Sequence, residues 1–109
     1  MAHRVVWTEA AVADLERILD YVVERDGVEH AERLYASLEP AIDGLADHPT
    51  RCRWVPELER IGLREHRELI VGPYRVPFRI VGREVVLLGV LDGRRDLEEL
   101  LLERSLRQR

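Results

Sequence analysis

The stretch "YRVPFRIVGREVVLLGVL", residues 74–91, decides the fold, because its apolar residues recur at every second position. In its first half an apolar set alternates with a set that holds two arginines: Tyr74, Val76, Phe78 and Ile80 against Arg75, Pro77, Arg79 and Val81. Successive side chains of a strand point to opposite faces, so one face should be core and the other should carry arginine. In residues 84–91 both sets are apolar, which indicates a strand inside a sheet whose second face is partly covered.

Two turn signals join this stretch into an antiparallel meander. Residues 82–83 ("GR") separate its halves, and residues 72–73 ("GP") connect it to "REHRELIV", residues 64–71, which also has the pattern of a strand. Pro77 cannot donate a ladder hydrogen bond, so the sequence predicts a bulge or a locally unpaired edge there. Farther along, "DLEELLLERSLRQR", residues 96–109, has leucines at helical spacing and predicts a helix that packs on the sheet or awaits a partner.

The N-terminal half predicts a strand followed by two helices. "HRVVW", residues 3–7, is a strand candidate, and Thr8 can accept the first hydrogen bond of a helix that Gly27 ends. A second helical pattern extends over residues 31–45, and Pro40 inside it should kink or divide the helix. The two helices should form an amphipathic hairpin.

Together these segments predict one α+β domain over residues 1–109, in the order β-α-α-β-β-β(-α). The helical hairpin should pack on one face of a small, mostly antiparallel sheet. Residues 49–62 contain two prolines and no sustained period, so they predict a connecting loop. The opposite face of the sheet should stay open and basic, and the residues expected on it are Arg75, Arg79, Val85 and Leu87.

Composition excludes several classes of protein. The chain has 109 residues, of which 46% are hydrophobic and 35% charged, which suits one domain with a modest core. Its apolar runs are far shorter than the roughly 20 residues of a membrane-spanning helix, and its N-terminus lacks the core of a signal peptide. We therefore expect a cytoplasmic protein. Cys52 is the single cysteine and has no partner at metal-ligand spacing, so neither a metal nor a cofactor is expected.

Charge is divided unevenly along the chain. Residues 1–50 hold four arginines and eleven carboxylates, a net charge of −7, whereas residues 51–109 hold thirteen arginines and ten carboxylates, a net charge of +3; the two sum to −4. All 17 basic residues are arginine. Coding bias in the genome can produce this composition without any functional cause. The planar guanidinium nevertheless suits recognition of carboxylate and phosphate groups.

Several segments, in order, resemble the RelE/ParE superfamily of type II toxins. The most telling are "DLERILDYV" at residues 14–22, "GPYR" at residues 72–75 and "VLDGRRDLEELL" at residues 90–101. The resemblance extends over nearly the whole chain. It implies a small bacterial toxin held inactive by a short, acidic, partly disordered antitoxin whose N-terminal part binds DNA, with a toxin–antitoxin hetero-oligomer as a further expectation. The arginines would then contact a polyanion or an acidic partner.

The superfamily divides by chemistry, and the residues at the nuclease positions separate the two classes. RelE-like members cut messenger RNA on the ribosome, whereas ParE-like members inhibit DNA gyrase. Where RelE-like nucleases place cations on the strand before "GPYR", this sequence has His66, Glu68 and Ile70. Arg94 falls where such enzymes keep a cation, but the tyrosine expected about six residues later is Leu100. A nuclease built on this chain would therefore have to use Arg94, Arg75, His66 and Glu68.

A binding role favours a different set of residues. We expect the target or antitoxin to contact the open face and the segment after the last strand, through Arg75, Arg79, Val85, Leu87, Asp92, Arg94 and Arg95. Structural alternatives stay open: Arg75 and Arg79 could pair with Glu68 or Glu84, and Arg94 and Arg95 could pair with Asp92 and Asp96. Trp54 could stack on a base or cover the edge of the core.

The sequence therefore favours a ParE-like toxin that inhibits DNA gyrase by binding. A RelE-like, ribosome-dependent endoribonuclease is the alternative, because one cation of the nuclease set is retained at Arg94. A non-toxic corepressor that only binds the antitoxin is a further alternative.

Overall fold

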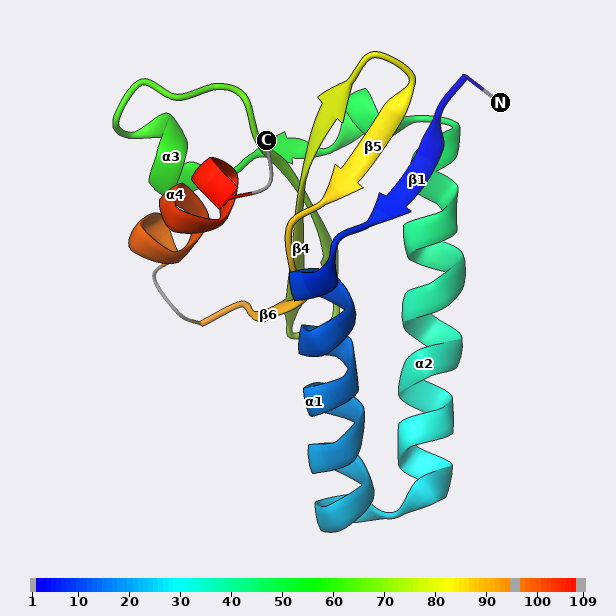
Figure 1. The fold of residues 1–109 in the computed structure, drawn as a ribbon. Helices are drawn as coiled ribbons and strands as arrows, with labels where there is room; N and C mark the ends of the chain where they lie inside the picture. Colours follow the sequence, from blue (N-terminus) through cyan, green and yellow to red (C-terminus); the bar gives the residue numbers. More distant parts are fainter. Residues whose placement is uncertain (1, 95–96, 108–109) are drawn as a thin grey trace.

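The computed structural model describes residues 2–94 and 97–107 (Figure 1). Strand β1 (Arg4–Trp7) leads into a hairpin of two helices, α1 (Glu9–Asp26) and α2 (Val28–Asp43). The later elements are, in chain order, the 3₁₀ turns η1 (Gly44–Ala46) and η2 (Pro49–Arg51), β2 (Arg53–Trp54), α3 (Pro56–Glu59), β3 (Arg67–Val71), β4 (Tyr74–Val81), β5 (Glu84–Leu87), β6 (Leu91–Asp92) and α4 (Glu98–Arg107). The predicted α+β class is confirmed, and the segment predicted as a loop contains η2, β2 and α3.

The strands form one mixed sheet. Its order is β1-β5-β4-β3-β2, and β6 pairs with β4 beyond the end of β5. Every pairing is antiparallel except that of β1 with β5, which is parallel. Figure 1 shows α1 and α2 together on one side of the sheet and α3 and α4 together on the other. The sheet is therefore covered by helices on both faces, at least in part.

The helical hairpin forms where the sequence predicted it. The Thr8 hydroxyl accepts a hydrogen bond from the amide of Ala11 and donates one to the carbonyl of Leu87, so it caps α1 and ties it to β5. Gly27, at φ 95°, ends α1 in a conformation that side chains rarely adopt. Pro40 does not divide α2, which continues to Asp43 before it tightens into η1. No helix within the described residues is long and apolar enough to cross a membrane.

The main core lies between this hairpin and the sheet. Its buried members are Ala11, Leu38, Ile42, Leu45, Val76, Phe78, Val85, Leu87 and Val90. The placement of Val85 and Leu87 on the open face was wrong, because both side chains are fully buried in this core. The register explains the error: Leu87 pairs with Phe78 and Val85 pairs with Ile80, and residues that pair across strands share a face.

The second face of the sheet is not fully open, which corrects another expectation. Helices α3 and α4 cover it with a second apolar cluster of Val55, Leu58, Leu91, Leu97 and Leu101. Leu97 and Leu101 are fully buried there. The C-terminal helix therefore packs on its own sheet, and the residues of β4 nearest to it are covered.

Pro77 lies where the neighbour of β4 changes from β5 to β6, and this gap explains how the sheet accommodates a proline. On this side β4 pairs with β5 from Phe78 onward and with β6 up to Arg75, so Pro77 has no ladder partner there, as predicted. On its other side Pro77 pairs with Glu68 of β3, so it does not lie at an edge of the sheet. The amide of Leu88 still donates to the carbonyl of Pro77 at 2.8 Å, an acceptor that proline retains. The sheet thus keeps one backbone hydrogen bond at Pro77, through its carbonyl, although proline has no N–H group to donate a second.

Asp14 of α1 binds two other parts of the chain near this gap between β5 and β6. Its buried carboxylate accepts hydrogen bonds from the amide of Val90 at 3.0 Å and from the guanidinium of Arg104, on α4, at 2.6 Å. A Cβ on Gly89 would collide with Arg104 and approach Asp14 Oδ2 to 2.8 Å, so a glycine is required for this contact. The ion pair therefore joins α4 to the first helix through the sheet edge.

Candidate functional site

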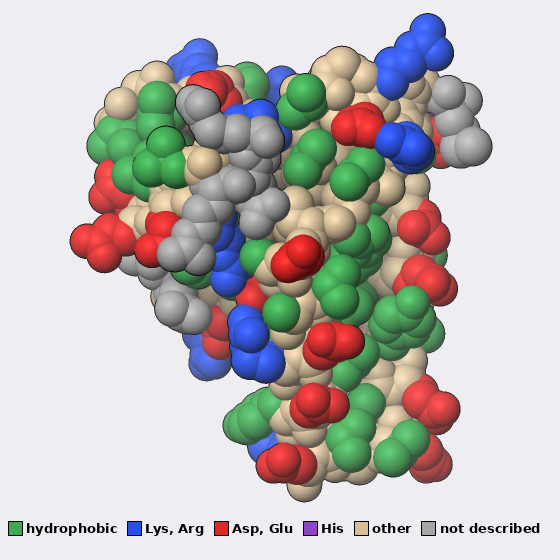
Figure 2. All heavy atoms as spheres, in the orientation of Figure 1, with side chains coloured by type: hydrophobic (Ala, Val, Ile, Leu, Met, Phe, Trp, Pro, Cys, Tyr) green, Lys and Arg blue, Asp and Glu red, His purple; other side chains and the backbone are tan. Residues whose placement is uncertain are grey.

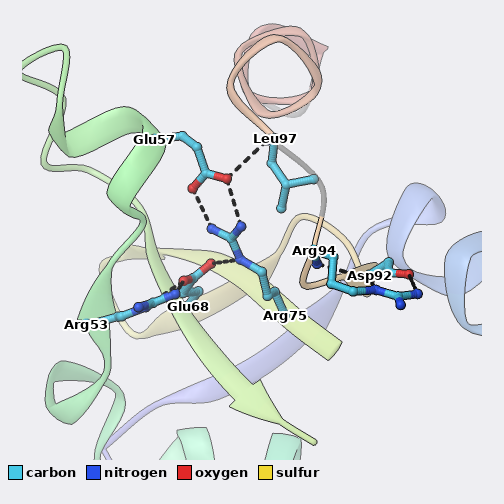
Figure 3. Close-up of polar contacts among 7 residues, drawn as sticks. All are labelled: Arg53, Glu57, Glu68, Arg75, Asp92, Arg94 and Leu97. Carbon is cyan, nitrogen blue, oxygen red and sulfur yellow. Dashed lines mark hydrogen bonds and ion pairs between the residues drawn. The ribbon is translucent and has the colours of Figure 1, made fainter. Parts of the chain in front are cut away.

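A buried ion network occupies the middle of the face where the open basic surface was expected (Figure 3). Arg75 of β4 donates from both terminal nitrogens to Glu57 of α3, at 2.7 and 2.5 Å. Its Nε donates to Glu68 of β3 at 2.8 Å. The three residues are only 6%, 5% and 1% exposed, in the order Arg75, Glu57 and Glu68. The guanidinium is therefore enclosed between two carboxylates.

The network continues to the surface on one side and to α4 on the other. The second oxygen of Glu68 accepts from Nε of Arg53, on β2, at 2.6 Å. Glu57 also accepts from the amide of Leu97, just before α4, at 3.1 Å. Because these partners come from β2, β3, β4, α3 and the start of α4, the network holds five parts of the chain in one arrangement.

The charge states of Glu57 and Arg75 are strongly fixed. The hydrogen bonds from Arg75 lower the pKa of Glu57 to about 2, against the opposing effect of burial. The same bonds raise the pKa of Arg75 above its already high ordinary value. Glu57 is therefore ionised at neutral pH, and Arg75 cannot offer an unoccupied cationic fork to a target. The sequence expectation that Arg75 lies on an open face was wrong.

His66 and Glu68 are not brought together as an acid–base pair. His66 is 3% exposed, and neither ring nitrogen has a hydrogen-bond partner among the residues that the structure describes. Burial lowers the pKa of His66, and the nearby Arg79 lowers it further. Both oxygens of Glu68 are taken by Arg75 and Arg53. A neutral, enclosed imidazole beside an occupied carboxylate has no route to a substrate proton.

Arg94 lies apart from this network. Figure 3 shows its side chain beside Asp92 and directed away from Arg75. Asp92 accepts from the backbone amide of Arg94 at 2.9 Å and from its guanidinium at 3.0 Å, so the predicted pairing with Asp92 is confirmed. The Arg94 side chain is 89% exposed, which leaves it accessible to a partner. Arg95, the other arginine predicted here, lies outside the described residues.

Trp54 and Arg79 lie around a separate cleft at the end of the sheet where β3 begins. The guanidinium of Arg67 lies 4.0 Å from the centre of the Trp54 ring, a cation–π contact that covers one face of the indole. Arg79 is half-buried and on the sheet face that carries Arg75. The expectation that Arg79 faces away from the main core is confirmed.

Sequence reasoning missed Glu57, which binds the buried Arg75, and Asp14, which binds the partly buried Arg104. Glu57 lies in a segment without periodicity, and nothing in its neighbourhood indicates a partner 18 residues away. Asp14 did carry a signal, since it follows Ala11 by three residues on the apolar stripe of α1. Within the described residues, no three His, Cys, Asp or Glu side chains form a group that could hold a metal ion.

A family model and two curated toxins connect this chain to one family. The family model for the ParE toxin of the type II toxin–antitoxin system parDE matches residues 5–97. Toxin ParE3 of Caulobacter vibrioides is 35% identical over 86% of this chain and 90% of its own. Toxin ParE1 of Mycobacterium tuberculosis is 33% identical over 93% of this chain and all of its own.

Two further matches show the fold and the breadth of the superfamily. A solved structure from the chromosomal ParDE toxin–antitoxin system of P. aeruginosa superposes with a TM-score of 0.71 and 25% identity, covering 84% of this chain and 96% of that one. Toxin RelE2 of Caulobacter vibrioides is 37% identical over 71% of this chain and 80% of its own. With the family model spanning most of its length, the chain belongs to the ParE family of type II toxins.

Proposed function

We propose that this toxin inhibits DNA gyrase by binding it, without cutting nucleic acid, and that a cognate antitoxin neutralises it. The proposal is carried by the buried network of Arg75, Glu57 and Glu68. It occupies the region where a RelE-like nuclease would need cations open to messenger RNA. That region holds the carboxylates of Glu57 and Glu68, and α3 and α4 cover them.

The chemistry of strand cleavage supports the same conclusion. Cleavage needs a base for the 2′-hydroxyl, an acid for the leaving oxygen, and cations for the charge between them. Glu57, whose pKa is about 2, is a very weak base, and the His66 ring is buried. Arg94 remains as one exposed cation, and electrostatics alone supplies only part of the acceleration that cleavage requires.

Membership of this family implies an antitoxin partner, and the helical hairpin offers a surface for one. Hydrophobic side chains lie along α1 and α2, with acidic side chains beside them (Figure 2). A groove of about 290 Å³ between the helices is lined by Leu15 and Leu38, with the exposed Val12 and Tyr35 among its walls. Exposed apolar side chains that share one groove favour an amphipathic partner.

A second candidate function has one observation in its favour. Toxin RelE2 of Caulobacter vibrioides, which is named for the other branch of the superfamily, is 37% identical over 71% of this chain. Under that alternative, Arg94 would be the cation that contacts the messenger.

One preparation of the toxin tests both functions. We expect dose-dependent inhibition of supercoiling by purified gyrase, and no cleavage of messenger RNA on programmed ribosomes. An Arg94→Ala variant separates the alternatives further, since it removes the retained nuclease cation. Cleavage at the ribosomal A site that is lost in Arg94→Ala, without gyrase inhibition, would replace this proposal with the nuclease. If the protein binds the antitoxin but neither inhibits gyrase nor cleaves messenger RNA, it is a corepressor.

A further inference from the structure

A cleft of about 490 Å³ lies between α1 and the segment that contains β6. Its α1 wall is one stripe of the helix, because the residues that line it recur at intervals of three and four from Asp14 to Arg25. The opposite wall includes Tyr74 and Arg94. Figure 3 shows the Arg94 side chain directed toward α1. The cleft therefore brings a helix from the start of the chain against the arginine that follows the last strand.

The cleft has an apolar floor and a charged rim. Val22, Val90 and Leu91 line it although they are at most 8% exposed, so they form its floor. At the rim, the side chains of Arg17 and Arg94 are 68% and 89% exposed. A few polar groups around an apolar surface are typical of sites that bind one apolar group in a fixed orientation.

Tyr21 and Arg25 continue the rim along α1. Tyr21 is 59% exposed, and the guanidinium of Arg25 lies 5.3 Å from the centre of its ring. This cation–π contact lies at the surface, outside both apolar clusters of the core. Tyrosine and arginine are enriched among the residues that dominate binding between proteins. The composition of the rim therefore favours a protein partner.

Two guanidiniums share the carboxylate of Asp14. Arg104 donates to both of its oxygens, at 2.6 and 3.1 Å, and Arg17 donates to one of them at 2.5 Å. Within residues 2–94 and 97–107, neither arginine forms an ion pair with another carboxylate. The three side chains together thus have a net charge of +1. Because Arg104 is nearly buried and Arg17 is exposed, the uncompensated charge lies at the rim of the cleft.

Arg17 and Arg94 keep hydrogen-bond donors for a partner. Arg17 uses one terminal nitrogen on Asp14, and the guanidinium of Arg94 uses Nε and one terminal nitrogen on Asp92. A guanidinium has five N–H donors, so each of these side chains can bind a second anion. The local carboxylates already restrict both side chains, which reduces the entropy lost when that anion binds.

We propose that this cleft binds an acidic segment of gyrase. The segment would place one apolar side chain on the floor and carboxylates against Arg17 and Arg94. The identity of the partner rests on the proposed function, in which the toxin inhibits gyrase by binding it. Arg17, Tyr21 and Arg25 would then act together with Arg94 in recognition of the target.

The charge of the lining favours a protein segment over DNA. Three arginines and two aspartates line the cleft, an excess of one positive charge. Affinity for DNA comes from several uncompensated cations on its phosphates, and the whole chain has a net charge of −4. Phosphates and sugars also offer nothing apolar to the floor. One carboxylate beside one apolar side chain matches both the charge and the floor.

The test uses the full-length toxin and a blocked synthetic pentapeptide, glycine–aspartate–leucine–aspartate–glycine. We expect the peptide to shift the NMR signals of Tyr21, Val22 and Arg94 and to leave those of Arg33 unchanged. Its binding should weaken as the salt concentration rises. The same peptide with lysine in place of both aspartates is the control and should not bind. Equal binding of the two peptides would overturn the proposal, because the arginines would then not select the ligand.

Three variants connect the cleft to the target. Arg17→Gln removes the excess charge and should weaken peptide binding and gyrase inhibition about tenfold. Arg33→Gln removes an exposed arginine of α2 that lies outside the cleft, and it should change both by less than about twofold. Tyr21→Ala keeps every charge and should weaken both about fivefold, so it tests the cleft even if Arg17→Gln does not fold. Melting temperatures establish which variants are folded.

The outcomes separate this proposal from the proposed function. If the parent toxin inhibits gyrase and the folded Arg17→Gln and Tyr21→Ala variants inhibit it equally, the cleft is not the target site, and the proposed function stands. If the parent toxin binds the acidic peptide but does not inhibit gyrase, the proposed function fails and the cleft keeps its acidic ligand. Displacement of the peptide by a ten-residue oligothymidine would overturn the proposal and identify a nucleic-acid site.

Discussion

Glu57 binds Arg75 with both carboxylate oxygens, at 2.5 and 2.7 Å, although the two residues come from a short helix and a strand 18 positions apart. Both are nearly inaccessible to water. Removing two charges from water is costly, and their attraction offsets that cost only while the pair is complete. The pair therefore fixes where α3 lies on the sheet, and the toxin depends on it in ways that stability measurements can detect.

Loss of one partner should destabilise the fold strongly. In Glu57→Gln the buried Arg75 keeps one carboxylate and loses the bidentate one, so we expect a loss of about 3–5 kcal/mol in the free energy of unfolding. Glu59→Gln, in the same helix, removes only an exposed pair at 3.4 Å and should cost less than about 1 kcal/mol. Urea denaturation measures both. Similar losses in the two variants would mean that the bidentate pair is not what holds α3.

Acid should weaken the same contact. The pKa of Glu57 is lowered to about 2 in the folded toxin from an ordinary value of 4.5, so the folded state binds this proton less readily than the unfolded state. Its stabilisation is complete above about pH 4.5 and is lost as the pH falls toward 2. Unfolding free energies measured between pH 7 and pH 2 should show this slope, and it should be smaller in Glu57→Gln.

His66 should add a separate pH dependence at milder acidity. Its pKa is lowered by burial first and by Arg79 second, while Glu65 opposes the shift. The contribution of neutral His66 to the free energy of unfolding is therefore fully present above the ordinary pKa of 6.5. It decreases as the pH falls below that value, because the unfolded state takes up the proton more readily than the folded state. His66→Phe should remove that decrease, and His48→Phe, at an exposed histidine, should leave it unchanged.

The contact between α1 and α4 should depend on Asp14. Asp14→Ala leaves the guanidinium of Arg104 and the amide of Val90 without this acceptor, so we expect a loss of about 3 kcal/mol and faster amide exchange throughout α4. Asp20→Ala, at an exposed position of α1, is the matched control. If α4 exchanges at the same rate in both variants, the helix is held by its leucines alone.

Arg94 should matter for the target and not for folding. Its side chain is almost fully exposed and, within the described residues, forms an ion pair only with the nearby Asp92, so Arg94→Glu should leave the melting temperature nearly unchanged. We expect about tenfold weaker gyrase inhibition, because charge complementarity with an anionic partner is lost. Arg33→Glu, on the exposed side of α2, controls for the change in net charge. Equal inhibition by Arg94→Glu and the parent toxin would place the target contact elsewhere.

The alternation in β4 predicted correctly which of its residues face the main core, because a period of two is a local property of a strand. The error at Val85 and Leu87 came from the register between strands. A two-residue turn pairs Val81 with Glu84, and counting from that pair places Val85 opposite Ile80. The turn signal therefore contained the information, although the apolar pattern of β5 did not.

The covered second face could not have been derived in the same way. Glu57 lies in a four-residue helix that begins at a proline, and its partners belong to strands farther along the chain. No local period encodes such a contact. The arginine on alternate positions of β4 indicated a polar face correctly, but whether that face meets water or a buried carboxylate depends on segments with no regular pattern of their own.

The parallel pairing of β1 with β5 has a consequence for how the toxin is made. Arg4 faces Glu84 and Trp7 faces Leu87, so the first strand pairs with residues that are synthesised 80 positions later. The hydrogen bond from the Thr8 hydroxyl to the carbonyl of Leu87 likewise cannot form before Leu87 has been synthesised. A contact over such a sequence separation forms only after the intervening chain exists. The growing polypeptide therefore lacks the β1 edge of its sheet until residues 84–87 have been synthesised, and a chain that ends before them cannot complete this sheet.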